Sequence, residues 1–283
     1  MAVFQNQASL RYRGLTTQSN ITSGEITDNA GFVKTAVSQG YTPDGRITYV
    51  LSLTNGGTED MNALVITDDL GAYSYEGQTL YSLAYTENSL QFYLNGELQP
   101  AGALTVIPGP PLTVDGLDLP AGANAVLVYE AQVTPYAPLG DAAVITNTAT
   151  LTDGTASRTA AATVPITAAP ALTISKSVDP TVVADDGKVT YTFVLQNTGT
   201  LPTNEEDEVS VSDAFDPVLA DLVVTLDGQP MARTAGYTYD DVTGAFATVP
   251  GQITVPAATC EQNADGTWSV TPGAAVLTVS GTI

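Results

Sequence analysis

The chain has 283 residues, of which 43% are apolar and 13% are charged, and its formal net charge is −22. This composition supports a buried core and argues against a disordered chain. Because a strongly acidic surface repels nucleic acid and anionic membranes, neither is expected as a partner. Without histidine, the chain lacks the commonest general base and metal ligand, so we expect no enzymatic activity, no cofactor and no metal.

The order of apolar and polar residues favours one fold class. Short runs rich in Thr, Val, Ala and Tyr are separated by Gly and Pro, and no long segment has the helical period. This pattern predicts an all-β protein, with sandwiches favoured over barrels. No apolar run is long enough to span a membrane. No basic and hydrophobic leader precedes Val3, so no secretory signal is expected and the export route stays open.

The first stretch, residues 2–10, alternates apolar and polar side chains and therefore predicts a half-buried strand. We predict that this strand pairs with a partner through five residues: Val3, Phe4, Asn6, Ala8 and Leu10. Residues 143–151 repeat the same pattern, and Asn147 takes the position of Asn6. In each copy an asparagine thus lies on the apolar face of a strand.

The whole chain consists of two copies of one unit. Residues 45–58 match residues 187–200, and residues 126–133 match residues 276–283. Past its last match the first copy continues into the Asn147 strand, whereas the second copy has no such continuation. The second copy is therefore expected to lack one strand, the counterpart of the Asn147 strand. A strand with the same pattern is predicted at residues 2–10 of the chain.

The expected organisation is two tandem immunoglobulin-like β-sandwiches with an N-terminal donor strand. The predicted parts are a donor strand and linker at 1–29, a first domain at 30–152, a linker at 153–169 and a strand-deficient second domain at 170–283. A strand from another molecule would complete the second domain, which is donor-strand complementation. Such head-to-tail contacts build rings or open filaments. Alternatively, residues 2–10 fold back onto the second domain of their own chain.

A lysine, an aspartate and an asparagine recur on the apolar faces of both copies. Lys34 and Lys176 occupy equivalent positions, and so do Asp68 and Asp213. Burial lowers the pKa of an amine, and a neutral lysine held against an asparagine side chain can attack its carbonyl, expel ammonia and form an isopeptide bond. The simpler alternatives are a lysine that extends to the rim, an aspartate that caps a turn and an asparagine that bonds nearby backbone.

Several short motifs carry a resemblance: Lys34-Thr35, Ile47-Thr48-Tyr49, Thr54-Asn55-Gly56, Ile66-Thr67-Asp68 and Asn147-Thr148-Ala149-Thr150-Leu151. In this order they resemble the repeat family called domain of unknown function 11, which occurs in surface proteins of Gram-positive bacteria. The chain is also similar to the isopeptide-forming immunoglobulin-like domains of Gram-positive pilins.

The resemblance implies that Lys34 joins Asn147 with the assistance of Asp68. The second copy departs from the family pattern because it lacks the asparagine strand. Its Lys176 would therefore join Asn6 of the next subunit, with Asp213 assisting.

These observations predict the structural subunit of an extracellular filament, a pilus or appendage on a cell or spore surface. The subunits form a head-to-tail homopolymer in this hypothesis. The alternative is a monomeric surface stalk or adhesin module that binds a ligand through loops 71–89 or 231–249. The acidic run 205–208 is expected to be a solvated loop, because it lacks the spacing of a calcium-binding loop.

Overall fold

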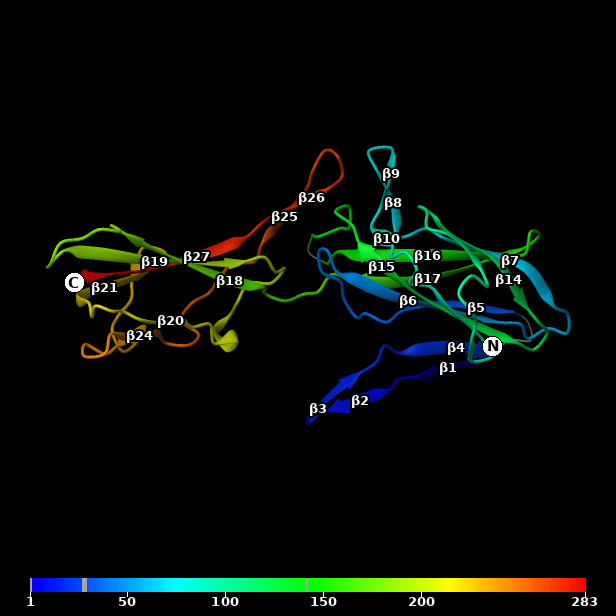
Figure 1. Ribbon diagram of the computed structural model, residues 1–283, viewed down its shortest axis with the longest axis horizontal. Coiled ribbons are helices and arrows are strands. Elements are labelled where there is room, and N and C mark those ends of the chain that lie inside the picture. The colour runs from blue at the N-terminus through cyan, green and yellow to red at the C-terminus, as the bar shows by residue number, and fades with distance from the viewer. Residues whose placement is uncertain (1, 27–29, 141) are drawn as a thin grey trace. The chain divides into compact units, whose positions relative to one another are not determined.

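The computed structural model describes residues 2–26, 30–140 and 142–283, and it confirms the all-β class: apart from one short 3-10 helix, the regular elements of these residues are strands (Figure 1). The chain divides into two compact units. The first contains Met1–Thr167 and Gln262–Trp268, and the second contains Ala168–Glu261 and Ser269–Ile283. No helix in the described residues has the length and hydrophobicity that a membrane span requires.

The first unit is a sandwich of two sheets. One sheet has the order β12-β11-β15-β6-β5, with β10 also on β15, and the other has the order β13-β14-β7-β16-β17. The strands of the first sheet are β5 (Gly31–Ala36), β6 (Arg46–Thr54), β10 (Leu83–Tyr85), β11 (Gln91–Leu94), β12 (Glu97–Leu98) and β15 (Asn124–Val133). Those of the second sheet are β7 (Met61–Asp68), β13 (Thr105–Ile107), β14 (Leu112–Leu119), β16 (Val144–Thr152) and β17 (Ser157–Pro165). A separate hairpin joins β8 (Ala72–Tyr75) to β9 (Gln78–Tyr81).

The core of the first unit lies between these sheets because alternate residues of their strands point inward. On β6, Ile47, Tyr49, Leu51 and Leu53 are buried, and the residues between them are more exposed. The same period of two runs along β15. The alternation in the sequence therefore identifies the inner faces correctly.

Residues 153–169, expected to be a linker, contain a strand instead. β17 pairs with β16 along its length, from Val144 opposite Pro165 to Thr152 opposite Ser157. β17 also packs against β5. The first unit is therefore completed by a two-stranded hairpin, β16–β17, and it extends to Thr167 rather than to residue 152.

The N-terminal segment has the same hairpin form. β1 (Ala2–Asn6) pairs with β4 (Thr22–Ile26), and β2 (Ser9–Tyr12) pairs with β3 (Leu15–Gln18). The predicted strand over 2–10 is thus interrupted between β1 and β2, and much of the expected linker forms its second arm. Side-chain positions of Val3 and Phe4 lie outside what the structure describes.

Within the described residues, the pairing partner of β1 is β4, a strand of the same N-terminal hairpin.

The second unit has one complete sheet and one short sheet, with the orders β18-β19-β27-β21-β22 and β20-β24-β23. Its strands are β18 (Leu172–Asp179), β19 (Lys188–Asn197), β20 (Ser212–Ala214), β21 (Ala220–Leu226), β22 (Gln229–Pro230), β23 (Tyr237–Tyr239), β24 (Ala245–Thr248) and β27 (Gly273–Thr282). A hairpin joins β25 (Thr259–Gln262) to β26 (Trp268–Thr271). The predicted acidic loop forms the 3-10 helix Glu205–Asp207, which Asn204 caps.

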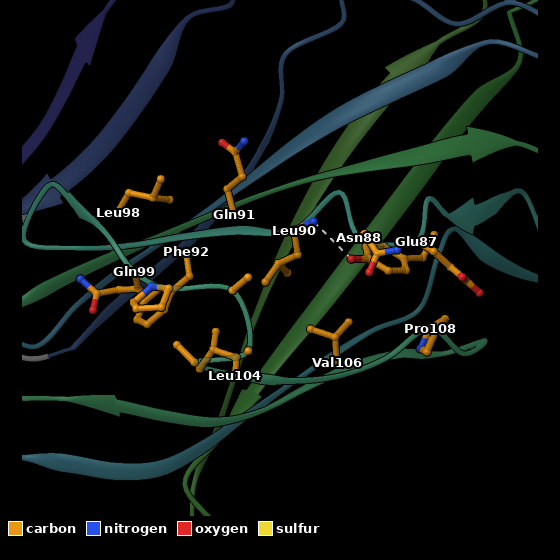
Figure 2. A pocket seen from close by; sticks show the side chains of 15 residues that line it. Glu87, Asn88, Leu90, Gln91, Phe92, Leu98, Gln99, Leu104, Val106 and Pro108 are labelled. Carbon is orange, nitrogen blue, oxygen red and sulfur yellow. Dashed lines mark hydrogen bonds between the residues drawn. The ribbon is translucent and has the colours of Figure 1, made fainter.

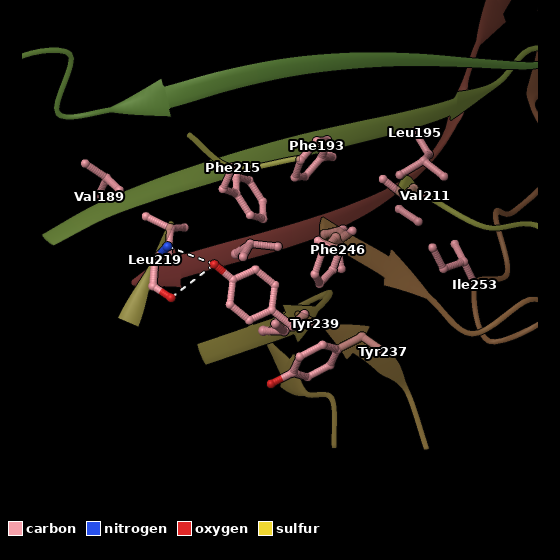
Figure 3. Close-up of a cluster of buried hydrophobic side chains, with 14 of the residues drawn as sticks. Val189, Phe193, Leu195, Val211, Phe215, Leu219, Tyr237, Tyr239, Phe246 and Ile253 are labelled. Atoms are coloured by element: carbon pink, nitrogen blue, oxygen red, sulfur yellow. Dashed lines mark hydrogen bonds between the residues drawn. The ribbon is translucent and has the colours of Figure 1, made fainter. Parts of the chain in front are cut away.

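The second unit buries an aromatic cluster between its sheets (Figure 3). The ring centroids of Phe215 and Phe246 lie 5.8 Å apart. The Tyr239 hydroxyl accepts a hydrogen bond from the Leu219 amide at 2.8 Å and donates to the Leu219 carbonyl at 3.1 Å. Its polar tip is therefore satisfied inside the core, as a buried tyrosine requires.

A comparison of the two units shows what the second one lacks. In the first unit β7 lies inside its sheet, between β14 and β16. In the second unit the corresponding strand, β20, pairs with β24 alone among the described residues. In the described residues of the second unit, no strand pairs with β20 at the position that β16 takes beside β7.

Candidate functional site

The first cluster of interest surrounds Lys34 on β5, whose side chain is 0% exposed. Its Nζ lies 2.5 Å from Oδ2 of Asp68, and the Asp68 side chain is 1% exposed. The amine also lies 4.8 Å from the centre of the Tyr49 ring, where the π-electrons attract a cation. Desolvation by burial lowers the pKa of Lys34, and this effect outweighs the opposing attraction of Asp68.

Asp68 ends β7 and uses both of its carboxylate oxygens. Oδ1 accepts a hydrogen bond from the Leu70 amide at 3.0 Å. Oδ2 accepts one from the Tyr129 hydroxyl as well as from Lys34. Asp68 therefore caps the turn after β7, the simpler role considered for it from sequence, and also forms an ion pair with Lys34. Burial raises the pKa of Tyr129, and the negative charge of Asp68 raises it further.

Asn147 on β16 is fully buried, and its carboxamide has a defined orientation. Its Nδ2 donates to the Tyr129 hydroxyl at 3.3 Å, and its Oδ1 accepts from the Gly71 amide at 3.3 Å. A backbone amide can only donate, so the carboxamide oxygen must face Gly71 and the nitrogen must face Tyr129.

The structure thus brings Lys34, Asp68 and Asn147 into one buried hydrogen-bonded cluster, as the sequence predicts. The covalent bond between Lys34 and Asn147 stays a prediction. Sequence reasoning missed Tyr129 and Gly71. The inward period of β15 places Tyr129 in the core, but only the approach of three other strands shows what its hydroxyl contacts.

The second unit holds an equivalent but open cluster. Lys176 on β18 forms an ion pair with Asp213, and their side chains are 41% and 18% exposed. The Lys176 Nζ lies 4.7 Å from the centre of the Tyr191 ring. Where the first unit has Tyr129, the matching position of the second unit is Val279, which has no hydroxyl. The predicted partner, Asn6, is exposed on the N-terminal hairpin.

The strand that carries Lys176 is also open on its apolar side. Leu172 is 40% exposed and Ile174 is 56% exposed. In the first unit the equivalent strand, β5, is covered by β17. The second unit therefore presents an uncovered apolar surface beside an unpaired strand edge, a combination that favours pairing with another chain.

The N-terminal hairpin also exposes apolar side chains. Leu10 is 64% exposed, Leu15 is 76% exposed and Ile21 is 57% exposed. Asn6 lies opposite Thr22, as Asn147 lies opposite Ala162 in the hairpin β16–β17. The first arms of the two hairpins therefore share a repeated sequence, but the pairing at the asparagine differs by one residue, because Asn6 pairs 16 residues further along the chain and Asn147 pairs 15 residues further along.

A separate hollow of about 470 Å³ lies in the first unit, where Leu90, Phe92, Leu104 and Val106 line it (Figure 2). Its rim includes Glu87 and Asn88, which belong to the predicted ligand-binding loop 71–89. None of the three residues of the buried cluster lines this hollow.

Comparisons with known proteins give distant structural similarities. No family model and no curated protein matches the chain. Membership of the family called domain of unknown function 11 thus stays a prediction.

Among solved structures, the major pilin subunit BcpA of Bacillus cereus aligns with 96% of this chain and 73% of its own, at 12% identity and a TM-score of 0.38. The major pilin GBS80 of Streptococcus agalactiae, as a C-terminal fragment, aligns with 86% of this chain and 85% of its own, at 12% identity and a TM-score of 0.34. The collagen-binding domain of a Staphylococcus aureus adhesin aligns with 47% of this chain and 96% of its own, at 12% identity and a TM-score of 0.31. At these TM-scores the similarities carry no argument about function.

Proposed function

We propose that the chain is the structural subunit of an extracellular filament, a homopolymer in which the N-terminal hairpin of one copy completes the second unit of the next. One observation carries this proposal. Lys176 and Asp213 are paired but partly exposed, whereas Lys34 and Asp68 are paired and buried. In the first unit, the hairpin β16–β17 buries the lysine–aspartate pair. Residues 2–26 are the repeated counterpart of this hairpin.

The fit of donor and acceptor follows from the first unit. By analogy with β16, the first arm of the hairpin pairs with the free edge of β20 and places Asn6 beside the ion pair. By analogy with β17, the second arm covers the exposed face of β18. The donor is therefore a two-stranded hairpin rather than the single strand expected from sequence. Such strand addition satisfies the unpaired backbone groups of the edge.

Two covalent bonds would then stabilise the filament. Lys34 and Asn147 join within each copy, and Lys176 joins Asn6 of the next copy, with Asp68 and Asp213 assisting. Each reaction is an amide exchange that needs no separate enzyme, because the sandwich holds the reacting groups at high effective concentration. The protein itself is structural and has no turnover, and its place is the cell or spore surface.

Denaturing electrophoresis of boiled, assembled protein tests the proposal. Wild type is expected to give a ladder of multimers, and Lys176→Ala or Asn6→Ala is expected to give monomers. Lys188→Ala is the matched control, because Lys188 is exposed on β19, and it should retain the ladder. Asn147→Ala should also retain the ladder while it loses the internal bond. Boiled wild type that runs as monomers would exclude the bond between subunits.

The second candidate function is a monomeric stalk or adhesin module, which the hollow beside Glu87 favours. Electron microscopy of concentrated protein separates the two. Filaments that disappear when residues 2–26 are deleted support assembly. A monomer at every concentration, with or without those residues, supports the stalk.

A further inference from the structure

We propose that Tyr129 is a catalytic residue of bond formation in the first unit: its hydroxyl conveys a proton towards the nitrogen that Asn147 must release. This inference rests on the proposed bond between Lys34 and Asn147. Tyr129 lies outside the set of Lys34, Asp68 and Asn147 that defines the proposed bond. The inference is based on a continuous series of contacts from the attacking nitrogen of the lysine to the leaving nitrogen of the asparagine.

The proton balance shows why a relay is needed. Transfer of one proton from Lys34 Nζ to Asp68 Oδ2 converts the ion pair into a neutral amine and a neutral carboxyl group. The amine then attacks Cγ of Asn147, forming a new C–N bond and a tetrahedral intermediate. At this stage Nζ carries one proton too many, and Nδ2 needs one more proton before it can leave as ammonia.

The contacts supply this path without a gap. Asp68 Oδ2 lies 2.5 Å from Lys34 Nζ and also accepts the Tyr129 hydroxyl, so one oxygen touches both the amine and the phenol. The Tyr129 oxygen in turn lies 3.3 Å from Asn147 Nδ2.

In the intermediate, Nδ2 becomes a basic amine with a free lone pair. Tyr129 gives its proton to Nδ2 and takes the proton that Asp68 holds, and Asp68 takes the excess proton from Nζ. The bond from Cγ to Nδ2 then breaks, which leaves one amide bond, one ammonia and a protonated Asp68.

The carboxamide oxygen has its own partner during this reaction. The Gly71 amide donates to Oδ1 at 3.3 Å, at the atom where negative charge develops in the intermediate. Gly71 has a φ of +65°, and a Cβ added there would lie 2.9 Å from the Ile145 side chain. Glycine therefore allows the backbone to approach Asn147 closely, and the carboxamide is held with its nitrogen towards Tyr129.

Tyr41, another buried tyrosine of the first unit, provides a matched control. Tyr41 is 2% exposed, and its hydroxyl donates to the Pro138 carbonyl rather than to a member of the cluster. Tyr41→Phe thus removes one hydroxyl and one hydrogen bond from the same unit while it leaves the relay intact. Tyr129→Phe removes the relay and retains the ring.

The experiment follows the intact mass of the full chain with time after cell-free synthesis, because bond formation lowers the mass by one ammonia. Wild type and Tyr41→Phe are expected to lose ammonia at similar rates. Tyr129→Phe is expected to react about 10²–10⁴-fold more slowly, the usual contribution of a positioned acid or base. Circular dichroism reports whether each variant is folded.

A second variant distinguishes proton transfer from a purely structural role. A fluorotyrosine at position 129 retains the hydroxyl but makes it more acidic, so it should restore the reaction with a shifted pH–rate profile. A profile identical to that of wild type overturns the relay, and so does a Tyr129→Phe variant that reacts as fast as wild type. Wild type that retains its full mass overturns the bond itself, and the relay with it.

Discussion

Lys34 and Lys176 occupy the same position on equivalent strands, yet the first side chain is 0% exposed and the second is 41% exposed. Each lysine forms an ion pair with the aspartate of its own unit. The difference is the hairpin β16–β17, which completes the first sandwich. Desolvation therefore already acts on the Lys34 amine, whereas the Lys176 side chain keeps contact with solvent. In the proposed filament, chemistry at the second site waits for docking.

The acceptor surface can be tested at Ile174. This side chain is 56% exposed, so Ile174→Asp should change the stability of the single chain by no more than about 0.5 kcal/mol. In the filament the residue would be covered, and the loss of about 1.5–3 kcal/mol of burial should weaken assembly about tenfold or more. Light scattering against concentration measures assembly, and Val242→Asp, at a position 85% exposed, is the control. Equal assembly by both variants would place the contact elsewhere.

The buried ion pair predicts a pH dependence that can be read in Asn147→Ala, where no internal bond forms. The pKa of Lys34 is lowered from 10.5, so between the folded pKa and 10.5 the unfolded state binds more protons than the folded state. The free energy of unfolding should therefore rise with pH in this interval. Above pH 10.5 the contribution of Lys34 is complete and the trend should reverse, because burial raises the pKa of Tyr129 and this tyrosine ionises first in the unfolded chain.

Urea unfolding at a series of pH values measures this dependence. Addition of Lys34→Met to the Asn147→Ala background should remove the rise, whereas addition of the exposed-site change Lys188→Met should preserve it. A rise that persists without Lys34 would assign the effect to other groups.

The two covalent bonds are predicted to form at different rates. Tyr129 connects Asp68 to Asn147 in the first unit, and Val279 offers no such group in the second. With docking saturated, the bond between subunits should form about 10²–10⁴-fold more slowly than the internal bond. Peptide mapping at successive times after assembly measures both in one sample. Equal rates would mean that the hydroxyl at position 129 has no part in the reaction.

A buried asparagine at the end of β19 is predicted to stabilise the second unit. Asn197 is 0% exposed; it accepts from the Ala171 and Gly199 amides at 2.9 Å each and donates to the Leu201 carbonyl at 2.8 Å. Asn197→Ala leaves these groups without their partner, which should cost about 1–3 kcal/mol. Hydrogen exchange of β19 should report a loss of protection of that size. The exposed-site change Gln229→Ala should leave β19 protection unchanged.

The sequence predicts the fold class and the buried cluster because both follow from a period of two. Lys34 and Asp68 lie on faces whose other members are apolar, so their burial together is a direct consequence of the pleat. The duplication then transfers the same expectation to Lys176 and Asp213. Their surroundings differ, because Lys34 is buried whereas Lys176 is partly exposed.

The period of two does not predict the two hairpins or the contacts of Tyr129. Residues 157–165 alternate small and polar side chains, such as Ala162 and Thr163, and this weak contrast resembles a linker more than a strand. Pairing along β16 and packing on β5 make it a strand, and both are tertiary interactions. The role of Tyr129 depends on side chains from three other elements, so no local pattern indicates it.

The unpaired edge of β20 has a consequence for how such a polymer would end. When a copy donates its hairpin to a neighbour, its own second unit is not completed by that contact. Every finite filament therefore retains one vacant acceptor and one unused donor. The two ends of the filament are therefore chemically distinct, and a different molecule would stop growth at each end. A free peptide with the sequence of residues 1–26 would seal one tip, and a copy without those residues would seal the other.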